Sequence, residues 1–154
     1  MSEAETLVAQ LVATFPALTG RVTVQRAKRV WIDVDRQAFP EVFRHLAKNL
    51  GFEVFCMITG LDEGADLGLI YHLARNEGLM ANVKTRCPKG ESMQTITSIF
   101  PGGGIYEREL IDLLGAHIEG LPEGPRYPLP DNWPKDEHPL LKDWKPREKG
   151  AQDA

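Results

Sequence analysis

The chain of 154 residues contains little cysteine: Cys56 and Cys87 lie far apart, and no CxxC pair occurs. This excludes a disulfide-dense secreted scaffold and is typical of a protein from a reducing compartment. Two thiols alone cannot hold an iron–sulfur cluster, and none of the four histidines is spaced from a cysteine or another histidine as in a zinc site. We therefore expect this chain to bind no metal or cofactor, and both cysteines to be small core residues.

A surplus of positive charge and a long apolar run are also absent. The 18 basic residues stand against 22 acidic ones, so no basic stripe is available for nucleic acid and no polybasic segment for anionic lipids. The longest strongly apolar stretch, residues 54–58, is far shorter than the roughly 20 residues that span a bilayer. The N-terminus also lacks the basic and apolar regions of a signal peptide. We expect a cytoplasmic protein whose membrane contact comes only through partners.

The first half of the chain shows clear local patterns. Apolar residues at helical spacing predict a helix over residues 3–15, with Ser2 as its N-cap and Pro16 as its stop. Alternating apolar residues on both sides of a short bend predict a hairpin over residues 22–34. A second amphipathic pattern predicts a helix over residues 39–50.

Three strands are predicted next, over residues 52–59, 67–74 and 80–87. The first of them is nearly all apolar, which is typical of a central strand. The predicted order is helix, two strands, helix and three strands. That order indicates an α+β fold, a two-layer sandwich with the helices on one face of a sheet.

The pattern changes after Pro88. Residues 92–100 are predicted to form a short helix, three glycines at 102–104 to break it, and residues 105–114 to form another helix. The glycines lack both phosphate-loop patterns, GxxxxGK[ST] and GxGxxG after a strand, so a flexible break explains them.

Seven prolines between Gly120 and Pro146 forbid regular structure there and predict an extended segment. Trp133 and Trp144 make this segment too apolar for a disordered tail. It must lie on a surface, which is its own domain, a neighbouring protein, or both. We therefore divide the chain into an α+β domain, residues 1–119, and a proline-rich docking segment with a polar tail, residues 120–154.

The densest charge cluster consists of Glu107, Arg108, Glu109 and Asp112. Paired carboxylates perform acid–base chemistry when burial raises the pKa of one of them. On a helix, however, Arg108 and Asp112 are neighbours at i and i+4, and a nearby arginine keeps acids ionised. We predict a buried or interfacial ion pair for Arg108, with Asp112 as one candidate partner, and expect its guanidinium to join the helix to neighbouring backbone. A structural or interface role is favoured over catalysis.

Residues 105–115 carry the sequence IYERELIDLLG. This run resembles the signature helix of the thirty-kilodalton (C-type) subunit of respiratory complex I, a subunit type also found in energy-converting membrane-bound hydrogenases and formate hydrogenlyases. In that family an extended LP-D-W segment and a PL-KD-aromatic close follow the helix. Here residues 129–133 are LPDNW and residues 138–144 are HPLLKDW. The likeness is strongest from residue 67 to residue 145.

The resemblance implies a non-catalytic structural or assembly subunit of a membrane-associated oxidoreductase or translocase, on the inner face of the cell membrane. It implies no cofactor in this chain, with iron–sulfur clusters, and nickel–iron in the hydrogenase branch, held by partner subunits. Those partners are a subunit like the large subunit of nickel–iron hydrogenases and small cluster-bearing subunits. Residues 103–105 and 121–126 depart from the complex I pattern toward the hydrogenase branch. The electron donor, the acceptor and the translocated ion therefore stay open.

Carried onto this sequence, the family's motifs place the subunit interface on two groups of residues. The signature helix contributes Tyr106, Glu107, Arg108, Glu109, Asp112, Leu113 and Gly115. The segment after it contributes Pro130, Asp131, Trp133, His138, Pro139, Leu140, Lys142, Asp143 and Trp144.

Two other functions compete with this hypothesis. One is a free-standing small-molecule enzyme that uses Glu107, Glu109 or His138 as acid–base groups. The other is a soluble adaptor unrelated to electron transfer. Co-purification with iron–sulfur partners separates the subunit from the enzyme, and neighbouring genes for hydrogenase-like subunits would exclude the adaptor.

Overall fold

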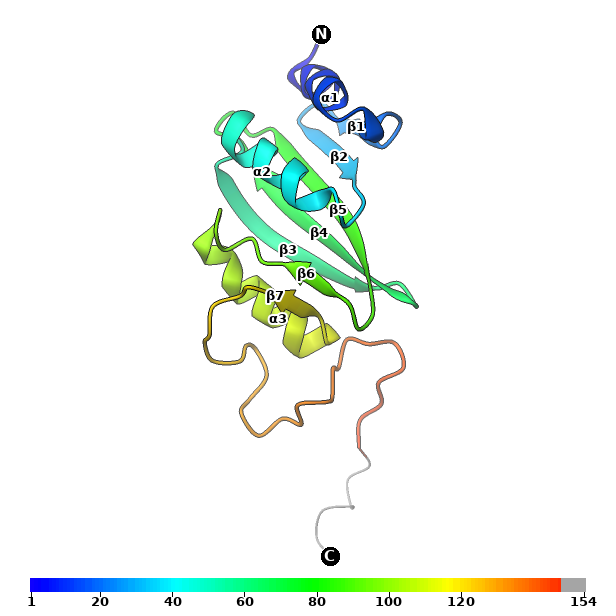
Figure 1. Ribbon diagram of the computed structural model, residues 1–154, viewed down its shortest axis with the longest axis vertical. Coiled ribbons are helices and arrows are strands. Elements are labelled where there is room, and N and C mark those ends of the chain that lie inside the picture. Colours follow the sequence, from blue (N-terminus) through cyan, green and yellow to red (C-terminus); the bar gives the residue numbers. More distant parts are fainter. Residues whose placement is uncertain (148–154) are drawn as a thin grey trace, which may run out of the picture.

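The computed structural model describes residues 1–147 (Figure 1). The helices are α1 (Glu3–Thr14), α2 (Phe39–Asn49) and α3 (Gly104–Leu114), and two short 3-10 turns are η1 (Pro16–Leu18) and η2 (Pro101–Gly103). The strands are β1 (Val22–Arg26), β2 (Arg29–Asp33), β3 (Val54–Asp62), β4 (Asp66–Ala74), β5 (Met80–Pro88), β6 (Ser92–Gln94) and β7 (His117–Glu119). Among these residues, no helix is long and apolar enough to cross a bilayer.

The main sheet has five strands in the order β1-β2-β5-β4-β3. Its neighbouring strands are antiparallel except β2 and β5, which run parallel. A small second sheet pairs β6 with β7 in parallel. The predicted α+β two-layer sandwich is confirmed.

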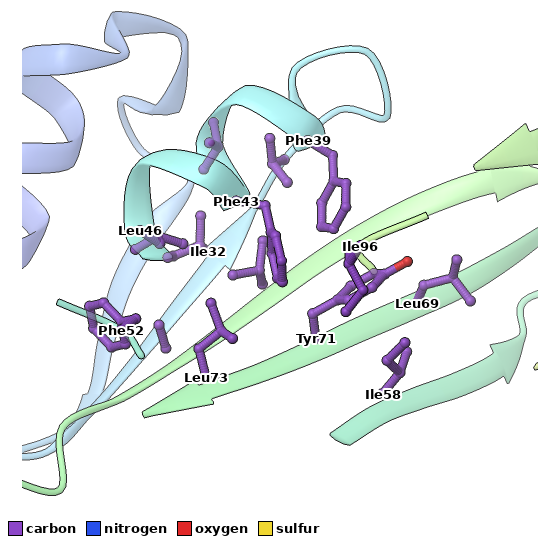
Figure 2. Close-up of a cluster of buried hydrophobic side chains, with 14 of the residues drawn as sticks. Ile32, Phe39, Phe43, Leu46, Phe52, Ile58, Leu69, Tyr71, Leu73 and Ile96 are labelled. Atoms are coloured by element: carbon purple, nitrogen blue, oxygen red, sulfur yellow. The ribbon is translucent and has the colours of Figure 1, made fainter. Parts of the chain in front are cut away.

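The helices cover one face of the main sheet. The register places Ile58 beside Tyr71 on this face, and the rings of Phe39 and Phe43 from α2 lie 4.5 and 5.5 Å from the Tyr71 ring (Figure 2). Helix α3 packs on the same face, against β3 at Gly60. Glycine is needed there because a Cβ would collide with the side chains of Leu110 and Leu114.

Local signals explain the predicted elements that the structure confirms. Ser2 caps α1 through a reciprocal capping box with Glu5, which satisfies two orphan N–H groups, and Pro16 follows the helix end. The hairpin β1–β2 forms with the predicted bend, and Pro40 lies in the first turn of α2. The predicted strands over residues 67–74 and 80–87 are β4 and β5.

Two predictions about the strands and helices were wrong. The apolar strand β3 is not central but forms an edge of the sheet. Only some of its apolar residues are there for the core: Phe55 and Ile58 pack into it, whereas Met57 and Leu61 are exposed. The helix predicted over residues 92–100 is absent: β6 begins this stretch, and the Thr97 N–H then bonds to the Thr95 hydroxyl. Such local side-chain bonds compete with helix formation.

Candidate functional site

Helix α3, the predicted signature helix, is closed at its end by Gly115. This residue has a φ of 69°, the left-handed conformation that glycine adopts without a Cβ penalty. Its N–H donates to the Ile111 carbonyl, and the Ala116 N–H donates to the Leu110 carbonyl. The bond from Gly115 to Ile111, with Gly115 in the left-handed conformation, is an αL C-cap, so the chain leaves the helix in a defined direction.

Glu107 lies in the first turn of α3 and is completely buried. Its carboxylate accepts hydrogen bonds from the Thr95 hydroxyl at 2.6 Å and the Ile96 N–H at 2.8 Å. Burial raises the pKa of Glu107 above its usual value, against the lowering effect of these two bonds and of Arg108. The side chain thereby joins α3 to the segment after β6. The sequence did not indicate this burial. It predicted instead that a nearby arginine keeps the acids of this cluster ionised.

Arg108 does not pair with Asp112, contrary to the prediction. Its Nη2 donates to the Pro122 carbonyl at 2.8 Å, so the expectation that it joins the helix to neighbouring backbone is confirmed. Asp112, which is 5% exposed, pairs instead with Arg126, with 3.1 Å between Oδ1 and Nη2. Arg126 follows in irregular chain, where no periodicity indicates a partner.

Asp112 is the centre of a junction between α3 and the C-terminal segment, as we call residues 120–147. Besides Arg126, it accepts a bond from the Leu129 N–H at 3.1 Å. Arg126 in turn donates from Nη1 to the Trp133 carbonyl at 2.7 Å. One carboxylate and one guanidinium therefore hold three positions of a segment that has no regular structure.

The last carbonyls of α3 are also satisfied by the C-terminal segment. Nδ1 of His138 lies 2.9 Å from the Asp112 carbonyl, and the Leu140 N–H donates to the Leu113 carbonyl at 2.9 Å. Carbonyls at a helix end lack partners within the helix. His138 therefore caps a backbone group at the end of α3.

A further attachment lies at the end of β3. The Asp62 carboxylate accepts a bond from the Lys142 N–H at 2.8 Å and pairs with Lys89 at 2.7 Å. The hydrogen bond from Lys89, followed by those from the backbone, holds the pKa of Asp62 well below its usual range. The C-terminal segment is thus fastened both to α3 and to the main sheet.

The two tryptophans of the segment contact each other. Their ring centroids lie 5.9 Å apart, and Nε1 of Trp133 donates to the Glu137 carbonyl at 2.8 Å. Both side chains are half-buried. The segment therefore packs on its own domain, which is one of the two surfaces that the sequence analysis proposed for it. The end of the predicted polar tail, residues 148–154, lies outside the described residues.

The predicted interface residues differ in accessibility. Those that are exposed are Pro130, Asp131, Leu140, Lys142 and Asp143. Those of intermediate exposure are Tyr106, Arg108, Glu109, Leu113, Gly115, Trp133, His138, Pro139 and Trp144, while Glu107 and Asp112 are buried. Their role in contacting a partner stays a prediction, and the buried ones make contacts within the chain.

The acid–base groups of the competing enzyme hypothesis do not converge. Glu107 lies in the first turn of α3 and faces Thr95, whereas His138 lies at its last turn. At about 1.5 Å of rise per residue, their attachment points are separated by roughly 8 Å along the helix. Within residues 1–147, no group of three or more His, Cys, Asp or Glu side chains is placed to hold a metal ion.

Comparison with known protein families decides the assignment. The model of the family described as respiratory-chain NADH dehydrogenase, 30 Kd subunit, matches residues 32–150. The chain belongs to this family. The resemblance seen in the signature helix and the motifs after it is confirmed.

Relatives of this 30 Kd subunit family come from several enzyme complexes. The chain is 27% identical to the C-type subunit of the F(420)H(2) dehydrogenase of Methanosarcina mazei, over 92% of both chains. It is 30% identical to the beta subunit of the membrane-bound hydrogenase of Pyrococcus furiosus, over 94% of this chain and 88% of the relative. It is 32% identical to the C/D subunit of the NADH-quinone oxidoreductase of Azotobacter vinelandii, of which it spans only 26%.

A solved structure shows the same fold. A chain in the structure of the membrane-bound sulfane sulfur reductase, an archaeal respiratory membrane complex, matches with a TM-score of 0.83 and 26% identity. The match covers 94% of this chain and 86% of that chain. Members of the 30 Kd subunit family thus belong to respiratory or hydrogenase-like membrane complexes, and this chain is a subunit of such an assembly.

Gly115 offers a direct test of how the C-terminal segment is seated. A Cβ at this position would lie 2.8 Å from Cδ2 of His138, in addition to the strain of the left-handed conformation. We expect Gly115→Ala to destabilise the fold by about 2 kcal/mol or more, as the sum of roughly 1 kcal/mol of backbone strain and the displacement of His138. Chemical denaturation measures the loss.

Gly90→Ala is the matched control. Gly90 also has a positive φ, 88°, but a Cβ there would meet no atom within 4 Å. Its replacement reports the backbone strain alone. Equal losses for the two variants would show that the packing of His138 against the end of α3 contributes nothing to stability.

Proposed function

We propose that this chain is a non-catalytic structural subunit that braces a subunit like the hydrogenase large subunit and the cluster-bearing subunits of a complex I-like or hydrogenase-like assembly. The observation that carries the proposal is the pre-ordered C-terminal segment. It is fastened at Asp112, at the end of α3 and at Asp62, yet Leu140 remains 55% exposed. A segment that is already ordered loses little conformational entropy when a partner docks on it.

The same proposal covers cofactors and location. We assign no cofactor to this chain and place the iron–sulfur clusters, with nickel–iron in a hydrogenase-type assembly, in its partners. The chain would lie on the inner face of the cell membrane, held there by other subunits. The relatives come from complexes that differ in substrate, so the proposal names no electron donor or acceptor for this assembly.

Affinity purification of the tagged chain from its native host tests the proposal. We expect subunits that contain iron–sulfur clusters to co-purify in stoichiometric amounts, and the recombinant chain alone to carry no iron, nickel, zinc or flavin. Recovery of the chain alone at native expression, or one equivalent of metal in the isolated chain, would contradict it.

Truncation after Gly120 should weaken capture of the large subunit at least tenfold, which equals about 1.4 kcal/mol. The remaining domain should still unfold cooperatively, because α1–α3 and the five-stranded sheet precede the cut. A pull-down together with thermal melts of both lengths measures the two effects. A truncated domain without a cooperative transition would show that the segment belongs to the core.

Leu140→Asp tests the same surface without removing the attachments of the segment. Because Leu140 is exposed, the variant should melt like the wild type and still lose affinity for the partner. Val24→Asp, at a residue that is 42% exposed on β1, is the control and should bind normally. Unchanged capture by the Leu140 variant and the truncated chain would move the interface away from the C-terminal segment.

A further inference from the structure

The outer edge of β3 has unpaired backbone groups. The strand spans nine residues and pairs with β4 on one side only. In an antiparallel ladder, alternate residues direct their N–H and C=O groups away from the neighbouring strand. Apart from the ladder with β4, no backbone group of residues 54–62 forms a hydrogen bond with another backbone group of residues 1–147. The groups that point away from β4 are therefore available to another extended chain.

This edge has little protection against strand pairing. Charged side chains and prolines commonly protect an exposed edge, but residues 54–61 contain neither. Its one protective irregularity is a bulge between Phe55 and Met57, after which the register continues unbroken to Asp62 over the longer part of the strand. The opposite edge, β1, is only five residues long, is bulged near its end and finishes with Arg26.

Exposed apolar side chains gather along the same strand. Val54, Met57 and Leu61 are 44%, 44% and 39% exposed. Leu61 also lines a surface hollow together with Gly60, Leu114 and Leu140, and with the charged residues Asp62, Glu63 and Lys142. Leu140 is the most exposed of the apolar side chains there. Figure 1 shows β3 as the outermost strand of the sheet, beside α3. A strand added here would find both backbone partners and apolar side-chain contacts.

We propose that the outer edge of β3 receives an extended, uncharged and apolar strand from a neighbouring subunit, which adds a sixth strand to the main sheet. The unpaired backbone groups select an extended chain, as in other cases of strand addition. The lack of charge on residues 54–61 selects an apolar strand. That the strand comes from another subunit rests on the proposed function.

Charge disfavours a second copy of this chain as the occupant. If residues 54–61 of two copies paired antiparallel about a two-fold axis, Glu53 of one copy would lie opposite Asp62 of the other, twice in the dimer. Like charges directly opposite each other destabilise a strand pair. An apolar strand from a different protein avoids this repulsion.

Hydrogen–deuterium exchange, resolved to single amides, tests the inference on the assembly purified from the native host and on the isolated chain. We expect alternate amides of residues 54–61 to exchange at least tenfold more slowly in the assembly.

Three outcomes would contradict parts of this inference. Unchanged exchange of these amides, with the partner subunits still bound, would overturn the strand addition and leave the bracing role intact. Absence of any co-purified subunit would overturn the proposed function itself. Protection that appears in the isolated chain and rises with its concentration would identify a second copy and overturn the choice of partner.

A double variant, Met57→Lys with Leu61→Lys, provides the independent measurement. Both side chains are exposed, so the variant should melt like the wild type, while charge on the edge should reduce recovery of the neighbouring subunit at least tenfold. Val24→Lys, at the opposite edge, should change recovery less than twofold. Equal recovery with all three proteins would contradict the proposal.

Discussion

Asp112→Ala is expected to lower the free energy of unfolding by about 3 kcal/mol, because it removes one partner of a largely buried ion pair. The carboxylate is 7% exposed and the Arg126 side chain 19% exposed, so the arginine would keep its charge without a counter-ion. The Leu129 N–H would lose its acceptor as well. Chemical denaturation at neutral pH measures the effect.

The loss should be accompanied by local release of the C-terminal segment. Arg126 is held by Asp112, and it holds the Trp133 carbonyl, so trypsin should cleave after Arg126 faster in the variant than in the wild type. Asp136→Ala is the control, since Asp136 is an exposed acid in the same segment. Surface substitutions of this kind usually change stability by less than about 0.5 kcal/mol. Indistinguishable behaviour of the two variants would show that the junction does not stabilise the fold.

Glu107→Ala should destabilise the fold at neutral pH, whereas Glu107→Gln should not. Alanine leaves the buried Ile96 N–H without its acceptor inside the protein, at about 1–3 kcal/mol, and also creates a cavity. The Thr95 hydroxyl loses the carboxylate but keeps the Thr97 hydroxyl at 2.8 Å as a partner. We expect a loss of about 3 kcal/mol or more. Glutamine keeps an acceptor for the Ile96 N–H and carries no charge to bury, so it should be tolerated.

The pH dependence of stability separates charge from packing at this position. Burial raises the pKa of Glu107 in the folded protein above the ordinary value of 4.5. The folded state therefore binds this proton more tightly than the unfolded state. The resulting stabilisation is complete below pH 4.5 and is lost as the pH rises through the folded pKa.

Glu107→Gln has no such loss. The difference in unfolding free energy between Glu107→Gln and the wild type should therefore shift in favour of the variant as the pH rises from about 4.5 to 8. Denaturation at four pH values in this range measures the difference. Glu109→Gln, at a partly exposed acid on the same helix, is the control for replacing a carboxylate by an amide. A constant difference for Glu107→Gln would mean that the carboxyl group is not desolvated.

Several elements could be predicted because the information for them is local. A cap at Ser2 and a stop at Pro16 define α1 within a few residues, and alternation on either side of a bend defines the β1–β2 hairpin. The α3 helix was identifiable both from its spacing and from its family motif. The three-residue strands β6 and β7 were not, since strands so short show no periodicity.

The candidate site was only partly visible in the sequence. The importance of residues 105–115 and of the tryptophans followed from motif and composition. The partners within the site did not follow: Asp112 bonds to Arg126 rather than Arg108, and Glu107 to Thr95. Each of these bonds joins a helix to irregular chain, where the direction of a side chain depends on how the segment folds back.

The sequence by itself determined the α+β class, the helices and strands with strong local periodicity, and the family of the chain. It also required the proline-rich segment to be extended and to lie on a surface. Only the tertiary structure decided which part of the domain the segment contacts and that β3 is an edge strand. It also decided that Glu107 is buried without an ion pair among the described residues. The reason is physical: local patterns specify backbone conformation over a few residues, whereas burial and pairing depend on contacts between segments far apart in the sequence.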